Sequence, residues 1–373
     1  MANIDSASLF PILPQQPTGI ARLAAEAEHV DDGHLVEFKA LQIRSILNRS
    51  VSKRRLWMAW SINPYRGCEF GCRYCYARYT HEFMVPKAPA SAGGEMGASP
   101  MTTTTAPTSA VDLRDPETFE RLIFLKQNAA WLLEQELRKI DPSEEIALGT
   151  ATDPYQPIER RARITRSLLE VFARKSGYRL GIVTKSRLIE RDADLLTEIA
   201  SRNTLVVHIT ITTANADLAR ILEPRAPRPD LRFQAVARLR EAGIRTGILC
   251  SPLLPGITDS EEALDGMARR AAEVGASFFA ASPLFLKPCS RPTYLSFVRE
   301  HFPSLMPDYT KRYGNADFAS PSYAREMAQR VDRVCRKYGL GKRSKDRLLP
   351  RTGGESRKPP VNINQPAQRR LFA

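Results

Sequence analysis

Six short apolar segments alternate with segments of helical pattern between residues 57 and 284, and this alternation limits the fold more than any other feature. Each apolar segment ends in polar residues, Gly or Pro, which is typical of strands covered on both faces. Strands that alternate with helices predict βαβ units and a parallel sheet. The predicted strands are WMAWSIN (57–63), EIALGT (145–150), YRLGIVTKS (178–186), LVVHITITT (205–213), IRTGILCSP (244–252) and ASFFAASPL (276–284).

A closed barrel of eight strands would need two more βα units than this pattern supplies. Residues 290–340 are instead helical in pattern and rich in aromatic residues. We therefore predict an α/β fold, a partial (β/α)6 TIM-like barrel with a C-terminal helical extension. Ligands of parallel sheets bind at the carboxyl ends of the strands, so we expect the functional site there. The predicted helices cover 115–140, 159–175, 189–201, 230–242 and 260–274.

Segments of different composition surround and interrupt the predicted core, residues 57–285. An insertion over 86–110 lacks periodicity and has few large apolar residues, so it cannot fold alone, and we interpret it as a surface insertion rather than a catalytic lid. We also predict disorder over residues 1–35, a helical extension over 286–340 and a disordered basic tail over 341–373.

The formal charge of +14 is concentrated at the end of the chain. Residues 341–373 hold nine Lys and Arg against two acidic residues, a net +7 that is half of the total. A basic tail of this kind is most simply a solvated terminus, and the alternative is a salt-dependent contact with nucleic-acid phosphates.

Composition is otherwise ordinary for a globular protein, with 43% hydrophobic and 26% charged residues in 373. No apolar run is long enough to cross a bilayer, and the first residues lack the basic and apolar pattern of a secretory signal. We therefore expect a cytoplasmic protein with no membrane partner.

Three of the six cysteines, Cys68, Cys72 and Cys75, lie within eight residues, whereas the other three are scattered and read as small buried side chains. Three thiolates can hold three irons of a [4Fe–4S] cluster and leave the fourth iron open to a substrate. The alternative is a structural zinc site with His81 as fourth ligand, although its spacing differs from that of common zinc sites. Arg66 and Arg78 flank the cysteines and could tune the potential of an anionic cluster.

Five blocks in order, NPYRGC…GCRYCYAR, ALGTATDPYQPIE, IVTKS, ITITT and ILEPRAP, resemble the radical S-adenosylmethionine (SAM) superfamily. They look most like the group related to spore photoproduct lyase and its uncharacterised bacterial relatives. The similarity covers about residues 57–285. It implies that Cys68, Cys72 and Cys75 bind a [4Fe–4S] cluster, that SAM binds the open iron, and that reductive cleavage of SAM produces a 5′-deoxyadenosyl radical. It also implies an external electron donor of the flavodoxin or ferredoxin type.

The resemblance assigns SAM contacts to residues at the carboxyl ends of the predicted strands. They are Tyr74, Gly149, Thr150, Thr152, Lys185 and Thr210. Tyr74 would lie near the adenine, the residues from Gly149 to Thr152 would receive the amino group, and Lys185 would pair with the carboxylate. Ordinary packing is the alternative for Tyr74, and strand propensity is the alternative for Thr210.

The catalytic residue is unknown, and Cys250, at the end of the fifth predicted strand, is a candidate hydrogen-atom donor with a buried thiol as its alternative. A surface turn explains Glu223-Pro224-Arg225 almost as well as a function. The implied reaction is of the lyase type on an unidentified substrate, with nucleic acid as the candidate. The competing hypothesis is a non-catalytic iron–sulfur or zinc protein whose basic tail binds nucleic acid.

Overall fold

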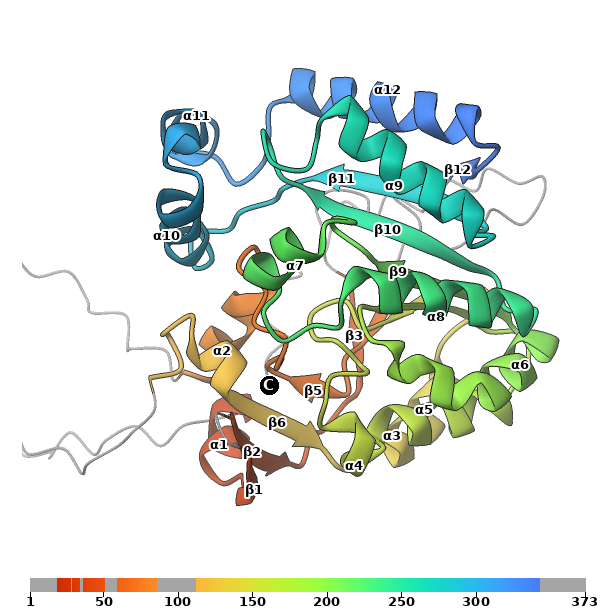
Figure 1. Cartoon of the computed structure of the whole chain (residues 1–373). Helices are drawn as coiled ribbons and strands as arrows, with labels where there is room; N and C mark the ends of the chain where they lie inside the picture. Colours follow the sequence, from red (N-terminus) through yellow and green to blue (C-terminus); the bar gives the residue numbers. More distant parts are fainter. Residues whose placement is uncertain (1–18, 28, 34–35, 51–58, 86–111, 343–373) are drawn as a thin grey trace, which may run out of the picture.

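Eight strands form one open sheet in the computed structural model, in the order β12-β11-β10-β9-β8-β7-β4-β3 (Figure 1). The structure describes residues 19–27, 29–33, 36–50, 59–85 and 112–342. The six central strands are all parallel and coincide with the six predicted strands, which confirms the partial barrel. They are β4 (Trp60–Ile62), β7 (Glu145–Leu148), β8 (Arg179–Thr184), β9 (Thr204–Thr210), β10 (Thr246–Leu253) and β11 (Phe278–Pro283).

Two short strands complete the edges of this sheet. β3 (Leu47–Arg49) pairs antiparallel with β4, and β12 (Gly341–Lys342) pairs parallel with β11. Both edges are therefore formed by segments outside the repeating βα units.

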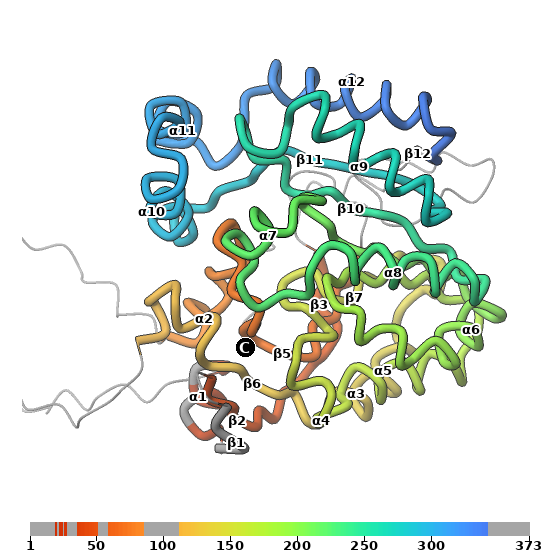
Figure 2. The backbone as a smooth tube through the Cα atoms, viewed as in Figure 1, coloured from red at the N-terminus to blue at the C-terminus, as the bar shows by residue number. Residues whose placement is uncertain are grey.

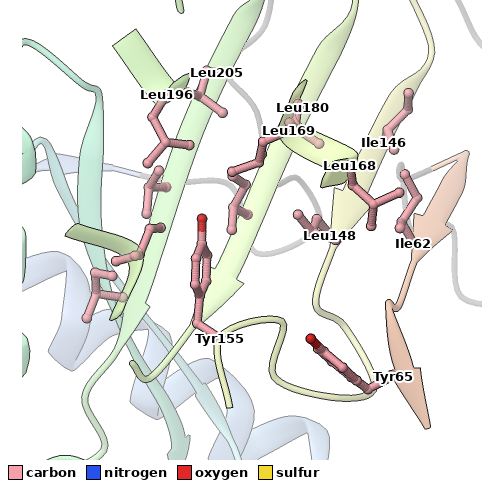
Figure 3. Packing of buried hydrophobic residues seen from close by; sticks show 14 of the residues in the cluster. Ile62, Tyr65, Ile146, Leu148, Tyr155, Leu168, Leu169, Leu180, Leu196 and Leu205 are labelled. Atoms are coloured by element: carbon pink, nitrogen blue, oxygen red, sulfur yellow. The ribbon is translucent and has the colours of Figure 1, made fainter. Parts of the chain in front are cut away.

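Helices cover the outer face of the sheet, as Figure 1 shows. Their buried leucines pack on strand residues, for example Leu168 and Leu196 with Leu180 and Leu205 (Figure 3). Burying one such side chain contributes about 1.5–3 kcal/mol, so this layer accounts for much of the stability. The helices are α3 (Ala129–Glu136), α4 (Glu159–Ala162), α5 (Ile164–Ala173), α6 (Ala193–Arg202), α8 (Pro229–Glu241), α9 (Glu261–Glu273) and α12 (Pro321–Lys337).

The predicted helix over 115–140 is wrong in its middle. Thr118–Arg121 is helical (α2), but Leu122–Lys126 forms strand β6, and the helix resumes only at α3, followed by a 3₁₀ turn over Leu137–Lys139. All five side chains of β6 are buried. A short run that is buried on both faces has no polar side to mark its period, so its apolar spacing does not separate a strand from a helix.

β6 belongs to a second, four-stranded sheet with the order β1-β2-β6-β5. The other strands are β1 (His29–Gly33), β2 (Val36–Leu41) and β5 (Tyr65–Arg66). The expected disorder over 1–35 is therefore wrong for α1 (Gly19–Ala25) and β1, because β2 pairs with β6 and supplies β1 with a partner. Residues 1–18 lie outside the described residues.

The C-terminal extension is helical and partly aromatic inside. α10 (Arg291–His301) and α11 (Met306–Tyr313), joined by a 3₁₀ turn over Pro303–Leu305, lie side by side, apart from the helices that flank the strands (Figure 2). Their tyrosines share an apolar cluster with Phe70, Cys72 and Tyr74. The extension is thereby packed against the cysteine loop, residues 67–76.

Three further short elements follow strands: 3₁₀ segments over Tyr76–Met84 and Arg187–Asp192, and helix α7 (Ala216–Leu222). In the described part of the chain, no helix combines the length and apolar character needed to cross a membrane. The insertion over 86–110 and nearly all of the basic tail lie outside the described residues, and the domain boundaries stay predictions.

Candidate active site

A cavity of about 320 Å³ lies at the carboxyl ends of the parallel strands. Its wall includes every residue that the sequence assigned to a cluster or to SAM. The structure therefore brings together residues separated by up to 142 positions, while their roles as ligands stay predictions. These residues are Cys68, Cys72, Tyr74, Cys75, Gly149, Thr150, Thr152, Lys185 and Thr210.

A larger groove of about 670 Å³ lies between α9 and α12 and contains none of these residues. Charged side chains line it and pair across it, as Lys337 does with Asp265 at 2.7 Å. We locate the chemistry in the smaller cavity, because the groove offers only paired surface charges.

Two glycines allow the cysteine loop to lie close to α2 and β6. Gly67 has a φ of +86°, and a Cβ there would lie 2.6 Å from the carbonyl oxygen of Leu122. Gly71 has a φ of +61°, and a Cβ there would lie 2.6 Å from Glu120 Oε2. A larger residue at either position would be strained by the positive φ. At Gly67 it would also clash with backbone oxygens, whereas at Gly71 it would meet the ends of flexible side chains.

Side-chain hydrogen bonds hold the backbone at or beside each of the three cysteines. Gln156 accepts from the amide of Glu69 (2.9 Å) and donates to the carbonyl of Gly67 (3.3 Å), and so brackets Cys68. Arg78 donates to the carbonyl of Cys72 at 3.1 Å, and Ser290 donates to the carbonyl of Cys75 at 2.7 Å. These contacts fix the loop before any metal is bound.

The three thiols line one cavity, as a cluster held by three cysteines would require. Among the described residues, no group of three or more His, Cys, Asp and Glu side chains is arranged around one ion position. Each cysteine of a [4Fe–4S] cluster binds a different iron, so the sulfurs must surround a volume, and these three thiols line one cavity.

His81 does not fit the fourth position of a zinc site. Its Nε2 lies 3.0 Å from the carbonyl oxygen of Leu122, and its ring packs against Phe119 and Phe124. The side chain is buried there and does not line the cavity. The geometry thus disfavours the zinc alternative.

Burial raises the pKa of all three thiols, to about 12 for Cys72, whose neighbour Lys185 opposes the effect. The thiols are therefore protonated at neutral pH in the metal-free protein. A metal that binds them must therefore displace protons.

The turn after β7 brings backbone and hydroxyl groups to the cavity. Gly149 has a φ of +88°, and the Asn63 side chain accepts from the amides of Ala151 (2.8 Å) and Thr152 (3.3 Å). The Thr152 hydroxyl donates to the carbonyl of Tyr65 at 3.3 Å, which leaves its oxygen able to accept a hydrogen bond. The carbonyl of Thr150 accepts from the Tyr76 hydroxyl.

Asp153, in the same turn, has a structural role. Its carboxylate accepts from the Thr184 hydroxyl (2.6 Å) and from the amide of Lys185 (2.7 Å). It thereby ties the end of β7 to the end of β8 and sets the place of Lys185.

Lys185 is the cation of the cavity. Its Nζ lies 5.6 Å from the centre of the Tyr74 ring and forms no hydrogen bond or ion pair with another described residue. Burial alone would lower its pKa, but the attraction of nearby acidic groups, Glu223 among them, outweighs burial and raises the pKa above its ordinary value. The ammonium group is thus charged and available to an anionic ligand.

The structure does not place Cys250 in the wall of the cavity, and its role as a hydrogen-atom donor stays a prediction. Its thiol is buried and lies 3.6 Å from the carbonyl oxygen of Thr212, whereas its neighbours Leu249 and Ser251 line the cavity. Successive strand side chains point to opposite faces, so the neighbours of Cys250 were the better candidates.

The sequence reasoning also missed an aromatic rim. Tyr76 and Phe285 both line the cavity with ring centres 5.8 Å apart, and Phe318 stacks on Phe285 at 4.3 Å. The only sequence signal was position: Tyr76 directly follows the last cysteine, and Phe285 follows the sixth strand. Of the two arginines expected near the cluster, Arg78 pairs with Glu120 (3.1 Å) and Arg66 donates to the carbonyl of Thr80 (2.6 Å).

Comparisons with known proteins agree with this geometry. The family model described as "Radical SAM superfamily" matches residues 62–267, more than half of the chain. An uncharacterised protein of Mycobacterium tuberculosis is 30% identical over 308 residues, 82% of each chain. An uncharacterised protein of Methanocaldococcus jannaschii is 28% identical over 200 residues, 54% of this chain and 62% of that one.

The solved structures that resemble this fold include mutants of spore photoproduct lyase. One has a TM-score of 0.54 with 16% identity, covering 81% of this chain and 79% of that one. Another, with bound AdoMet and dinucleoside spore photoproduct, has a TM-score of 0.54 with 15% identity over the same shares. At this identity the likeness shows a shared fold.

Proposed function

The chain belongs to the radical SAM superfamily, and on this premise we propose that it is an enzyme in which Cys68, Cys72 and Cys75 hold a [4Fe–4S] cluster and the neighbouring cavity binds SAM. One observation carries the proposal: the three thiols and the candidate SAM contacts line the same cavity. When bound, the cluster supplies the electron that cleaves SAM to methionine and a 5′-deoxyadenosyl radical, which abstracts hydrogen from a substrate.

The residues of this chain bind and orient SAM in that proposal. The unpaired ammonium of Lys185 attracts the SAM carboxylate. Gly149 lets the backbone approach closely, and the oxygens of Thr150 and Thr152 can accept hydrogen bonds from the amino group. Tyr74 and Thr210 complete the wall on the side of the cysteine loop and β9.

Apolar side chains enclose the rest of the cavity and keep water away from a reactive radical. Phe70, Val183 and Leu249 line it from three different segments, and Phe285 adds a wall from the C-terminal extension. Exclusion of water and fixed orientation are what a protein contributes when the cofactor carries the difficult chemistry.

We propose nucleic acid as the substrate class, with a lyase-type reaction. Exposed aromatic side chains at the rim, Tyr76 and Phe318, together with Phe285, offer faces on which bases can stack. The basic tail adds phosphate-binding charge. The related fold has been solved with a dinucleoside photoproduct, which supports the same class.

An external electron donor of the flavodoxin or ferredoxin type is the partner that this proposal requires. Reductive cleavage of SAM consumes one electron, which the cluster would pass on from a reductant. Membership of the radical SAM superfamily supports a separate reducing protein as that source.

Anaerobic reconstitution with iron and sulfide tests the proposal. We expect a brown protein with about four irons and four sulfides per chain that cleaves SAM when reduced. Cys72→Ala should lose the cluster, whereas Cys335→Ala, which removes a buried thiol near Phe279 in β11, should keep it. A colourless protein with one zinc per chain, or a Cys72→Ala variant with wild-type iron and sulfide, would contradict the assignment.

A further inference from the structure

We propose that Glu223-Pro224-Arg225, directly after α7, is a clamp that positions the cysteine loop for SAM binding. Glu223 and Arg225 are positioning residues in this role, since neither lines the cavity. The inference rests on the proposed function in one respect, that the cysteine loop holds the cluster. The clamp and the preceding Leu222 contact the loop at three points: a hydrogen bond from Tyr74 to Glu223, the close approach of Arg225 to Gly71, and a backbone hydrogen bond from Arg73 to Leu222.

The first point is the Tyr74 hydroxyl. It donates to Glu223 Oε1 and lies 2.8 Å from the Thr212 hydroxyl, which itself lies 3.0 Å from the same carboxylate oxygen. Tyr74 stands between Cys72 and Cys75 in the chain. A carboxylate that holds its hydroxyl therefore fixes the backbone between two thiols.

Arg232 in α8 makes Glu223 immobile. It forms an ion pair with Glu223 Oε2 at 2.5 Å and donates to the carbonyls of Pro227 (2.6 Å) and Thr210 (3.1 Å). Both partners are almost fully buried, at 2% exposed for Glu223 and 1% for Arg232. A buried charge that leaves its partner is costly, so the carboxylate stays in place against β9 and α8.

The second contact is the close approach of the Arg225 side chain to Gly71. Arg225 pairs with Glu120 at 3.5 Å, and its Nη2 lies 2.7 Å from where a Cβ on Gly71 would be. Glu120 also pairs with Arg78, which holds the carbonyl of Cys72. Arg225 therefore closes a chain of charges along the outer side of the loop.

The third point is the backbone. The amide of Arg73, between Cys72 and Tyr74, donates to the carbonyl of Leu222 at 2.9 Å. The ring of Pro224 fixes its backbone angle φ. The side chains of Glu223 and Arg225 therefore extend from a turn with little backbone freedom. Residues from 222 to 225 thus contact the loop on both sides of Cys72.

A purely stabilising ion pair is the alternative, and the chain contains a suitable comparison. Glu145 and Arg179 form another buried ion pair, at 3.4 Å. The pair lies at the amino ends of β7 and β8, whereas the cavity lies at their carboxyl ends. Likewise, Tyr178 donates from a buried hydroxyl to the carbonyl of Leu137 at 2.9 Å, away from the cavity. Glu145→Gln and Tyr178→Phe therefore serve as matched controls for Glu223→Gln and Tyr74→Phe.

The first measurement uses the full chain without metal, and maps alkylation by iodoacetamide at each cysteine with mass spectrometry. Tyr74→Phe and Glu223→Gln are each expected to speed alkylation of Cys72 and Cys75 about tenfold, because loss of a hydrogen bond to a charged group opens the loop more often. Cys335, buried in α12, is the internal reference and should keep its rate. The double variant should react no faster than the faster single variant, because Tyr74→Phe deletes the hydrogen bond that Glu223→Gln weakens by removing the charge of its acceptor.

The second measurement uses the reconstituted protein and records the EPR spectrum of the reduced cluster with and without SAM. We expect the two variants to alter the SAM-dependent spectral change and to weaken SAM binding about tenfold, while the two controls match the wild type. General destabilisation would lower the melting temperature of the controls as well and would leave the spectrum unchanged.

Alkylation rates of Cys72 and Cys75 within about twofold of the wild type in both Tyr74→Phe and Glu223→Gln would contradict the proposed clamp. That result is separate from a failure of the proposed function, which would appear as a wild-type protein without a cluster. The alkylation rates need no metal, so they decide for or against the clamp in either case.

Discussion

Gly149→Ala tests whether the turn after β7 must lie as close to β8 as the structure has it. Gly149 has a φ of +88°, and an added Cβ would lie 2.4 Å from the carbonyl oxygen of Val183 and 2.5 Å from Pro154 Cδ. Real Cβ atoms essentially never approach another atom within 3.0 Å, so the turn or the strand must move by about 0.6 Å. Both neighbours are rigid, one a strand backbone and the other a proline ring.

Two costs add in this variant. The left-handed backbone costs an alanine about 1–2 kcal/mol, and overpacking against rigid neighbours costs about 1–3 kcal/mol. We therefore expect the free energy of unfolding to fall by about 2–5 kcal/mol. Gly243→Ala separates the two costs, because Gly243 has a φ of +77° and nothing within 4 Å of an added Cβ.

Urea unfolding of the metal-free protein, followed by circular dichroism, measures both variants. In Gly243→Ala the free energy of unfolding should fall only by the backbone cost, about 1–2 kcal/mol. Gly149→Ala should lose more and should also bind SAM more weakly after reconstitution, because the displaced turn carries Thr150 and Thr152. Equal losses in the two variants would refute the reasoning that close packing fixes this turn.

Three more predictions follow from individual side chains. Lys185→Met should weaken SAM binding about tenfold or more at unchanged iron content, and calorimetry that shows wild-type affinity would contradict its role. Burial lowers the pKa of His81 from 6.5 to about 4. As the pH falls, the imidazole therefore binds a proton in the unfolded chain before it does so in the folded protein. Stability should therefore fall by up to about 3 kcal/mol between pH 6.5 and 4, and His81→Gln should flatten that slope in urea unfolding. Truncation after Leu340 should weaken DNA binding and reduce its salt dependence, and unchanged salt-sensitive affinity would exclude the tail from binding.

The strands of the barrel were predictable because the same burial requirement applies to each of them. A parallel strand covered on both faces must be apolar along its length, and β7, β8 and β9 meet that demand with only a few polar side chains. The same property misled the prediction for β6, whose run LIFLK continues the apolar spacing of the helices on either side. β6 pairs with β2, about 85 residues away in the sequence. A long-range contact of this kind cannot be predicted from the local periodicity of apolar residues.

The site was predictable to the extent that it lies next to strand ends. Lys185 and Gly149 directly follow β8 and β7, so their place at the cavity follows from topology. The side chains that hold the loops around the cavity were not predictable in the same way. Asn63 and Gln156 act through hydrogen bonds to backbone groups of distant segments, and polar side chains of this kind carry no periodic signal.

The bond from Ser290 to the carbonyl of Cys75 joins residues 215 positions apart. On the ribosome, the cysteines therefore emerge long before the residue that holds the last of them. A nascent chain that ends before α10 therefore lacks the contact at Cys75, although Gln156 and Arg78 already hold the loop near Cys68 and Cys72. The cysteine loop thus receives its last support from a segment that is synthesised much later, and its final conformation depends on completion of the C-terminal extension.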